Sequence, residues 1–305
     1  MAFSRRREMV FVYTVTDANP NGDPLNANHP RFDEETEQVL VSDVRIKRTV
    51  RDQWIRDGRM VFIDGEPKTL KDRFEELKKE TQKTGARDVM AKCIDSRLFG
   101  VTFALGNDAF AWTGPVQFKW GRSLHAVTVN FVQGTSAFAT EGRRGEDKQQ
   151  RSFRNEYKVP FAAVCVYGIA NQFASERTGA TEEDLDVLRE TLWQGTNNLI
   201  TRSKNEHTSA FYLEVTYRPG FIGKIGALDD KIKIVGINSE ELTREQGRSL
   251  RSMAECKLDI TDLVSGITSH AQDIQNIVLR TGGGVVVDGL QVLKGLKIAI
   301  QEIQG

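Results

Sequence analysis

The sequence lacks an excess of either charge: its 305 residues include 42 lysines and arginines against 42 aspartates and glutamates. This balance argues against a chain coated in one sign of charge, although a basic groove can still lie beside an acidic surface. The chain is also poor in cysteine and histidine, with three and four respectively, all widely separated. Such spacing indicates neither a disulfide framework nor a zinc site, so no metal or cofactor is expected.

Long apolar runs are missing as well. No segment approaches the ~20 apolar residues that a membrane span needs, so no membrane contact is expected. The N-terminal stretch MAFSRRREMVFVYTV has a basic start, but its apolar part is short and no small-residue cleavage site follows. We therefore interpret it as a first strand rather than a signal peptide, and expect a reducing cytoplasm as the compartment.

Familiar catalytic signatures are also absent. The sequence contains no phosphate-binding P-loop, no HExxH and no GxSxG motif. The TGGG segment at 281–284 is explained more simply as a turn. Asp17, Asp23 and Asp33 could serve a metal or act as a base, but acidic residues in a turn-rich loop usually form the turns. A protein without enzymatic activity is therefore expected.

What is present predicts a mixed α+β fold. Period-two and helical patterns place strands at 9–16, 114–120, 126–132, 161–170 and 211–217, and helices at 42–57, 68–83, 86–99 and 181–202. Early and late elements interleave, which favours one sheet core with long insertions over two separate domains. Residues 133–159 form a polar stretch that is too long for an ordinary hairpin loop of ~2–5 residues.

The predicted helix at 42–57, with Ser42 as its N-cap, combines an apolar stripe with a basic rim. Ile46, Val50 and Trp54 recur every four residues and form the stripe. The basic residues beside and around it are Arg45, Lys47, Arg48 and Arg51. This rim could bind phosphates, or it could be a solvated face on which Asp43, Asp52 and Asp57 pair with the arginines.

The turn-rich loop at 17–30 bears on that choice. Asn19 and Asn21 carry amide donors, and Gly22 and Asp23 are expected to expose backbone N–H groups near the helix start. Turns of this kind and helix N-termini favour anions. Polyanion binding therefore stays open beside the solvated-face interpretation.

The long polar stretch is a second candidate for nucleic-acid binding. Its basic residues alternate with Phe153 and Tyr157; they are Arg143, Arg144, Lys148, Arg151, Arg154 and Lys158. Basic side chains bind backbone phosphates and aromatic faces stack on unpaired bases. A solvated loop is the alternative, because four acidic residues dilute the charge.

Five motifs, in this order, resemble a known family. They are NPNGDP (19–24), VSDVRIKRTVRD (41–52), IDSRLFG (94–100), GPVQFKWGRSLH (114–125) and EHTSAFYLEV (206–215). Together they are similar to the backbone subunit of type I CRISPR surveillance complexes, the Cas-seven family, and within it to the type I-B and I-C branches. The resemblance covers residues 8 to 300 or so.

The resemblance implies a single hand-shaped unit. Its palm would be ferredoxin-like, of the RNA-recognition (RRM-like) type, and would comprise residues 8–57, 86–125, 160–218 and the C-terminal strands. A helical fingers insertion would comprise 58–85 and parts of 219–280. An extended thumb β-hairpin would comprise 126–159.

The resemblance also implies a function in antiviral defence. Copies of the chain would polymerise into a filament along one crRNA guide and leave its bases free to pair with a target DNA strand. Other Cascade partners would be the large subunit, a Cas-five-type subunit and the guide-processing ribonuclease. Two alternatives are a type III-like backbone subunit that cuts target RNA with Asp17, Asp23 or Asp43, and a stand-alone single-strand RNA-binding protein. The chain lacks the strand signature of ordinary RNA-recognition domains, which argues against the latter.

Site residues follow from the same resemblance. Guide-backbone contacts would come from the first palm helix and the loop before it: Asn19, Asn21, Ser42, Arg45, Lys47, Arg48 and Arg51. Phe131 and Val132, with Gln133, match the place where a bulky pair wedges beside a displaced base. Strand alternation leaves another possibility, that Phe131 turns inward with Val127 and Val129. Arg143 and Arg144 would lie on the thumb and touch guide or target.

Overall fold

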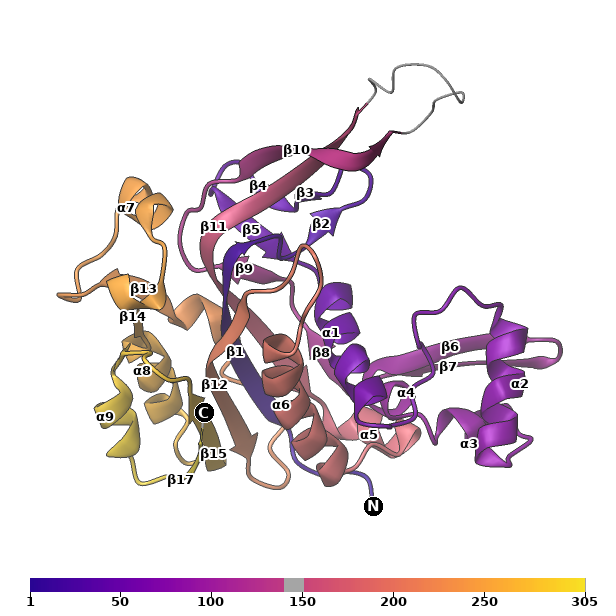
Figure 1. The fold of residues 1–305 in the computed structure, drawn as a ribbon. Helices are drawn as coiled ribbons and strands as arrows, with labels where there is room; N and C mark the ends of the chain where they lie inside the picture. Colours follow the sequence, from indigo (N-terminus) through magenta and orange to yellow (C-terminus); the bar gives the residue numbers. More distant parts are fainter. Residues whose placement is uncertain (140–150, 305) are drawn as a thin grey trace, which may run out of the picture.

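The computed structural model describes residues 1–139 and 151–304. Its core is a ten-stranded sheet, mostly antiparallel, in the order β17-β15-β12-β1-β11-β9-β5-β4, with β8 and β10 also paired to β11 (Figure 1). The strands are β1 (Arg7–Ala18), β4 (Phe32–Asp33), β5 (Gln38–Val41), β8 (Val116–Phe118), β9 (Gly121–Ser123), β10 (Asn130–Ala139), β11 (Arg151–Ala170), β12 (His207–Tyr217), β15 (Ile274–Thr281) and β17 (Ala299–Ile303). The predicted α+β class is confirmed.

Strand β1 is central because both of its faces are apolar. Met9 and Phe11 point into a core shared with α1 (Asp43–Arg56), α4 (Ile94–Phe99) and α6 (Glu182–Asn197). Val10 and Val12 point into a second core on the other face, shared with α8 (Thr261–Ser269) and β14 (Cys256–Asp259). Successive side chains of a strand alternate between faces, so one apolar run supports two cores.

The helices on the first face begin where the sequence predicts. The Ser42 side chain accepts a hydrogen bond from the Arg45 N–H at 3.3 Å and caps α1, and the predicted stripe of Ile46, Val50 and Trp54 is buried. Thr181 and Asp184 form a capping box at the start of α6. This helix ends at Asn197 rather than at residue 202.

A small lobe lies beside the sheet and has its own core (Figure 1). It contains α2 (Leu70–Thr81), α3 (Ala86–Met90), β6 (Gly100–Leu105) and β7 (Asp108–Thr113). The prediction of one helix over 86–99 is wrong: the chain turns at residues 91–93, where the Cys93 N–H bonds to the Met90 carbonyl and the Ile94 N–H bonds to the Met60 carbonyl. The lobe's core includes residues on both sides of the expected fingers boundary at residue 85.

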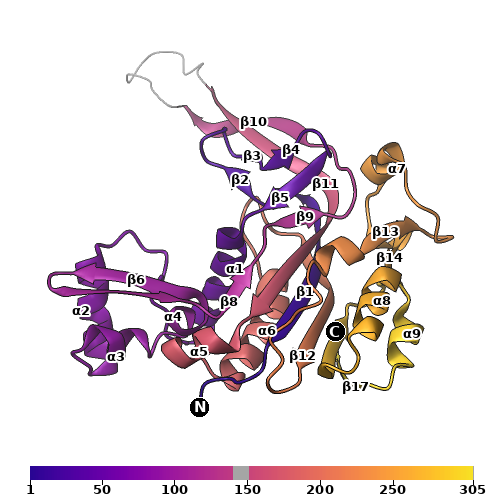
Figure 2. The same cartoon turned by 180° about the vertical axis from the view of Figure 1, so that it is seen from behind.

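A long hairpin projects from one end of the sheet (Figures 1 and 2). The second half of β11 pairs with β1, while its first half pairs with β10. Within the polar stretch, residues 133–139 and 151–158 thus belong to the two arms of the hairpin. The predicted strand at 126–132 begins only at Asn130. The Val127 N–H bonds to the Glu37 carbonyl, which belongs to no strand, and the Val127 side chain is buried. Arg143 and Arg144 lie outside the described residues.

The other face of the sheet is covered by the C-terminal third of the chain. It contains β13 (Lys233–Gly236), β14, β16 (Val287–Asp288), α7 (Arg244–Ser249), α8 and α9 (Leu290–Lys294). The remaining elements are short: α5 (Gln172–Thr178), the pair β2 (Gly22–Asp23) and β3 (His29–Pro30) within the first loop, and two 3-10 helices, η1 (Asp229–Lys231) and η2 (Met253–Glu255). No helix in the described part of the chain is both long and apolar enough to cross a bilayer.

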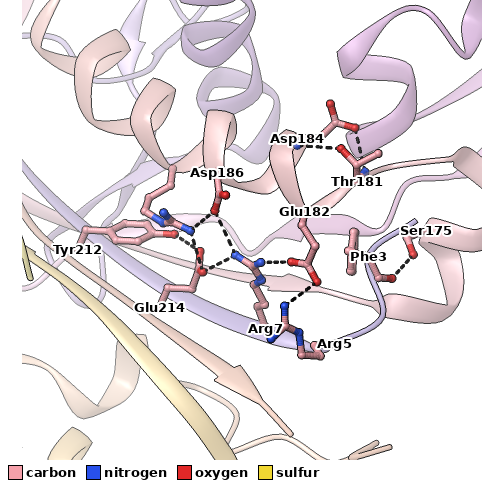
Figure 3. Close-up of polar contacts among 11 residues, drawn as sticks. Phe3, Arg5, Arg7, Ser175, Thr181, Glu182, Asp184, Asp186, Tyr212 and Glu214 are labelled. Atoms are coloured by element: carbon pink, nitrogen blue, oxygen red, sulfur yellow. Dashed lines mark hydrogen bonds and ion pairs between the residues drawn. The ribbon is translucent and has the colours of Figure 1, made fainter. Parts of the chain in front are cut away.

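A polar network ties α6 to the sheet at the end remote from the hairpin (Figure 3). Arg7 on β1 pairs with Glu182 at the start of α6 and with buried Glu214 on β12, the latter at 2.7 Å. The Tyr212 hydroxyl donates to the second oxygen of Glu214 at 2.7 Å. Since Arg7 and Ala18 are the two ends of β1 and the hairpin arm joins at Ala18, this network stabilises the fold away from the hairpin.

Candidate nucleic-acid interface

A cleft of about 320 Å³ opens at the hairpin end of β1. Three chain segments line it: the loop after β1, the β11 arm of the hairpin, and the loop between α6 and β12. The residues that line it are Asn19, Gly22, Asn28, Asn155, Glu156, Tyr157, Lys158, Arg202, Ser203 and Lys204. The sheet brings these segments together, because Ala18 pairs with Val159 and the Asn19 N–H donates to the Ser203 carbonyl at 2.8 Å.

Asn19 shapes the first of these segments. Its amide nitrogen donates to the Asn28 carbonyl at 2.7 Å, and its amide oxygen accepts from the Asn21 N–H at 3.1 Å. Both asparagines are buried, and Asn19 uses both ends of its amide within the loop. Asn19 holds the loop in shape, and among the described residues the amide nitrogen of Asn21 has no partner.

Basic side chains form the wall of the cleft. Lys158 comes from the hairpin arm, and Arg202 and Lys204 come from the loop before β12. Glu156 pairs with Arg202 at 3.2 Å and with Lys158 at 3.9 Å. Burial, and secondarily the nearby Arg45 guanidinium, lower the pKa of Lys204 to about 8. Three cations with one acidic neighbour in the cleft suit an anionic ligand.

Arg202 and Lys204 were not among the predicted site residues. The only signal for them is a short TRSKN run at 201–205, which overlaps the end of the helix predicted at 181–202 and precedes the strand predicted at 211–217.

An aromatic row runs from the first loop to the hairpin. The Tyr157 ring lies between His29, at 4.8 Å between ring centroids, and Phe131, at 5.1 Å. Phe131 and Val132 are 52% and 47% exposed, so the alternative in which Phe131 turns inward is wrong. Gln133 is exposed next to them and donates to the Asn155 side chain at 3.3 Å. Aromatic faces of this kind are the platforms on which unpaired bases stack.

The basic rim of α1 is largely paired within the protein. Lys47 lies 3.3 Å from Asp43 and 3.3 Å from the Gln117 side chain. Arg48 pairs with Asp52 and is partly exposed. Arg45 donates to the Thr49 hydroxyl at 2.9 Å. The expected pairing of arginines with the helix's own aspartates is thus present for Asp52, whereas Asp57 accepts from Gln53.

Arg51 requires a correction, because it is not on an exposed rim. Its side chain is buried, with Nε 2.8 Å from Asp95 on α4 and the guanidinium over the Phe99 ring. Asp95 also accepts from the N–H groups of Phe62 and Ile63 at 2.6 and 3.1 Å. Arg51 therefore joins α1 to the segment that leads into the small lobe.

The aspartates considered for catalysis are dispersed. Asp17 is exposed, Asp23 pairs with Arg31 at 3.3 Å, and Asp43 pairs with Lys47. Asp33 pairs with Arg122, whose hydrogen bond lowers the pKa of the carboxyl. Within residues 1–139 and 151–304, no three metal-ligating side chains gather at one point.

Comparisons with known proteins agree with one another. Over 319 aligned positions the chain is 28% identical to "CRISPR-associated protein Cas7" of Haloferax volcanii, covering 94% of this chain and 90% of that protein. Its fold is similar to a chain of a solved "CRISPR RNA-guided surveillance complex, pre-nicking" (TM-score 0.56, 13% identity, 98% of this chain and 96% of that one). It is also similar to a chain of a "CRISPR RNA-guided surveillance complex" (TM-score 0.51, 14% identity, 92% and 90%). The family model "CRISPR-associated protein Cas7" matches residues 5–261, and because that is most of its length, the chain belongs to the Cas7 family.

Proposed function

We propose that this chain is a non-enzymatic, guide-RNA-binding backbone subunit of a type I Cascade complex. The observation that carries the proposal is the cleft at the hairpin end of β1, in a chain that belongs to the Cas7 family. It combines Lys158, Arg202 and Lys204 with the Tyr157 ring. Phosphates bind the cations while an aromatic face accepts a base, which is how sequence-independent single-strand binding is built.

In this proposal the hairpin is the thumb and the sheet with α1 and α6 is an RRM-like palm. The lobe that contains α2, β6 and β7 belongs to the fingers. Phe131 and Val132, exposed near the base of the hairpin, displace a guide base. Arg48, the partly exposed cation of α1, contributes a phosphate contact, and the buried Arg51 supports α1 from within.

Assembly follows from the same geometry. A hairpin that projects this far from its own sheet reaches a second copy, and a heterologous contact that does not close produces a filament. The guide would then present its bases to target DNA. The remaining partners are other Cascade subunits, in the cytoplasm, and the type I-B or I-C branch is the expected subtype.

Sedimentation with single-stranded RNAs of increasing length tests the proposal. We expect one further protomer for each fixed increment of RNA. Binding should weaken as salt rises, and the logarithm of affinity should fall against the logarithm of salt concentration with a slope of ~0.7 per phosphate contact. A stoichiometry that stays at one protomer whatever the RNA length would refute the backbone role. Incubation with complementary RNA and magnesium addresses the type III-like alternative, since cleavage there would refute the non-enzymatic assignment.

A further inference from the structure

A second cavity lies at the base of the hairpin, next to the cleft. Its volume of about 310 Å³ is at the lower end of the range for small-molecule sites, ~300–1,000 Å³. Its walls are the first loop with the β4–β5 turn, the chain that leads into β10, and α7, which lies at the same end of the molecule as the hairpin (Figures 1 and 2). Its lining includes His29, Phe32, Glu37, Val127, Val129 and Arg248.

His29 connects this cavity to the cleft. It lines the cavity, and its ring contacts Tyr157, which lines the cleft. Phe131 pairs with Tyr157 in the hairpin register and lies two residues after Val129, roughly 7 Å along a strand. The row of His29, Tyr157 and Phe131 therefore forms the border between cleft and cavity. A nucleic-acid strand whose phosphates lie in the cleft has a base within reach of the cavity.

Arg248 reaches the cavity because α7 packs closely on the chain before β10. The buried His125 ring links the two. Its Nε2 accepts from the Ala163 N–H at 3.3 Å, so Nδ1 carries the hydrogen and donates to the Gly247 carbonyl at 2.9 Å. A Cβ on Gly247 would lie 3.3 Å from backbone atoms of Ala126, so this close approach favours glycine. Arg248 follows directly and enters the cavity lining with its side chain 41% exposed.

Glu37 occupies a backbone position that is costly for a glutamate. Its φ of 58° lies in the left-handed region, where a turn usually places glycine or asparagine. Its Oε2 is buried and has no hydrogen-bond partner among the described residues, since Arg248 Nε is 3.6 Å away. A buried acceptor without a donor calls for an explanation, and a bound group that supplies the donor is one.

The mixed charge of the cavity suits a neutral ring better than a phosphate. Glu34 and Glu37 are two carboxylates against the single guanidinium of Arg248, so a phosphate is disfavoured. Phe32 and Val127 provide apolar surface for the face of a ring. The cavity therefore differs in chemistry from the cleft, whose three cations suit phosphates.

We propose that this cavity is a nucleobase pocket, which receives one unpaired base of the RNA strand whose phosphates lie in the cleft. The inference rests on the proposed function and extends it, because it names where the base displaced by Phe131 and Val132 goes. The Glu37 carboxylate accepts from an N–H of the base, and the Arg248 guanidinium donates to a ring nitrogen or carbonyl. Every base carries both kinds of group, so the pocket tolerates a guide of any sequence.

Fluorescence quenching distinguishes a base in the pocket from a base in solvent. The probe is the shortest single-stranded RNA that retains one protomer, with 2-aminopurine placed at each position in turn. This analogue is bright when it is unstacked, and dissolved acrylamide quenches it when it is exposed. We expect one position that is bright but quenched about threefold less than the free nucleoside, because a pocket buries ~70% or more of its ligand.

An abasic site at that position measures what the base contributes, because normal and abasic RNA carry the same phosphates. We expect the affinity of the wild-type chain to fall roughly tenfold, within the range for one stacked base. Glu37→Gly should keep the fold, since a φ of 58° suits glycine, yet reduce this penalty to less than about threefold, as should Arg248→Ala. Arg244→Ala is the matched control: Arg244 is also exposed on α7 but does not line the cavity, so the tenfold penalty should remain.

The outcomes distinguish the inference from the function on which it rests. A bright position that acrylamide quenches as fully as the free nucleoside places the base in solvent and overturns the pocket. So does RNA binding in which every position stays dim, or an abasic penalty that is the same in wild type, Glu37→Gly and Arg248→Ala. Each of these results leaves the proposed function standing, whereas absence of RNA binding by the wild-type chain overturns both.

Discussion

The buried ion pair between Arg51 and Asp95 leads us to predict different roles for two arginines of α1: Arg51 stabilises the fold, whereas Arg48 binds RNA. Arg51→Ala removes the guanidinium that lies 2.8 Å from a carboxylate only 1% exposed on its side chain. It also removes the cation over Phe99. Sequence spacing places Arg51 beside Arg48 on one helix, yet the structure gives them opposite surroundings.

The cost of Arg51→Ala can be worked from those surroundings. Removing one partner of a buried ion pair typically costs ~3–5 kcal/mol, because the other charge stays buried and unpaired. Asp95 keeps three backbone donors, from Phe62, Ile63 and Ser96 at 2.6, 3.1 and 3.0 Å, which offset part of that loss. We therefore expect a decrease of about 3 kcal/mol in the free energy of unfolding, at the lower end of this range.

Urea unfolding combined with RNA binding provides the assay. Arg48→Ala is the control, because its pair with Asp52 is partly exposed and should contribute no more than ~1 kcal/mol. We expect Arg48→Ala to weaken RNA binding with little change in stability, and Arg51→Ala to do the reverse at temperatures where it stays folded. An Arg51→Ala chain as stable as wild type but deficient in RNA binding would refute this assignment of roles.

Three further changes have distinct expected outcomes. The double change Phe131→Ala, Val132→Ala should alter the free energy of unfolding by less than ~1 kcal/mol, because both side chains are exposed. It should also remove the periodic unstacking of guide bases that a fluorescent base analogue reports. If that periodic signal is undiminished, Phe131 and Val132 are not the residues that displace a guide base. Asn19→Ala should cost ~1–3 kcal/mol in thermal unfolding, since the Asn28 carbonyl and the Asn21 N–H lose their partner, and a neutral result would remove its role in the loop. The pKa of Lys204 in the folded chain lies below its ordinary 10.5. The unfolded chain therefore binds more protons between about pH 8 and 10.5, and the free energy of unfolding increases as pH rises through that window. Lys204→Gln should be more stable than wild type by ~1 kcal/mol near pH 7, after discounting for solvent around the amine; equal stability at pH 7 would contradict the burial of its charge.

Much of the fold could be predicted because its central elements carry strong local signals. Strand β1 has an apolar run flanked by turn residues, and α1 has a serine cap and a four-residue apolar period. The errors fall where tertiary contacts override local pattern. Residues 86–99 look helical throughout, but a turn at 91–93 lets Ile94 bond to Met60. Such a contact between segments more than thirty positions apart leaves no local trace.

The candidate site could be predicted only in part, for a related reason. The exposure of Phe131 at a strand-to-hairpin junction follows from its lack of a core to enter. The burial of Arg51 does not, because its partner Asp95 lies on another helix, beyond the reach of any helical spacing rule. Periodicity identifies which side of a helix a residue occupies, but whether that side faces water depends on the neighbouring element.

The loop that carries Arg202 and Lys204 shows why a strand-end site escapes motif reading. In the sequence its cations stand among turn residues and resemble ordinary surface charge. The register of the sheet brings these cations together. Val15 pairs with His207 and Ala18 pairs with Val159, so the end of β1, the start of β12 and the hairpin arm meet at the same end of the sheet. Lys158 on the hairpin arm and Arg202 and Lys204 just before β12 then add into one field. Such a site can be recognised in a sequence only when it is known which strands pair, because the charges near the ends of paired strands must be counted together.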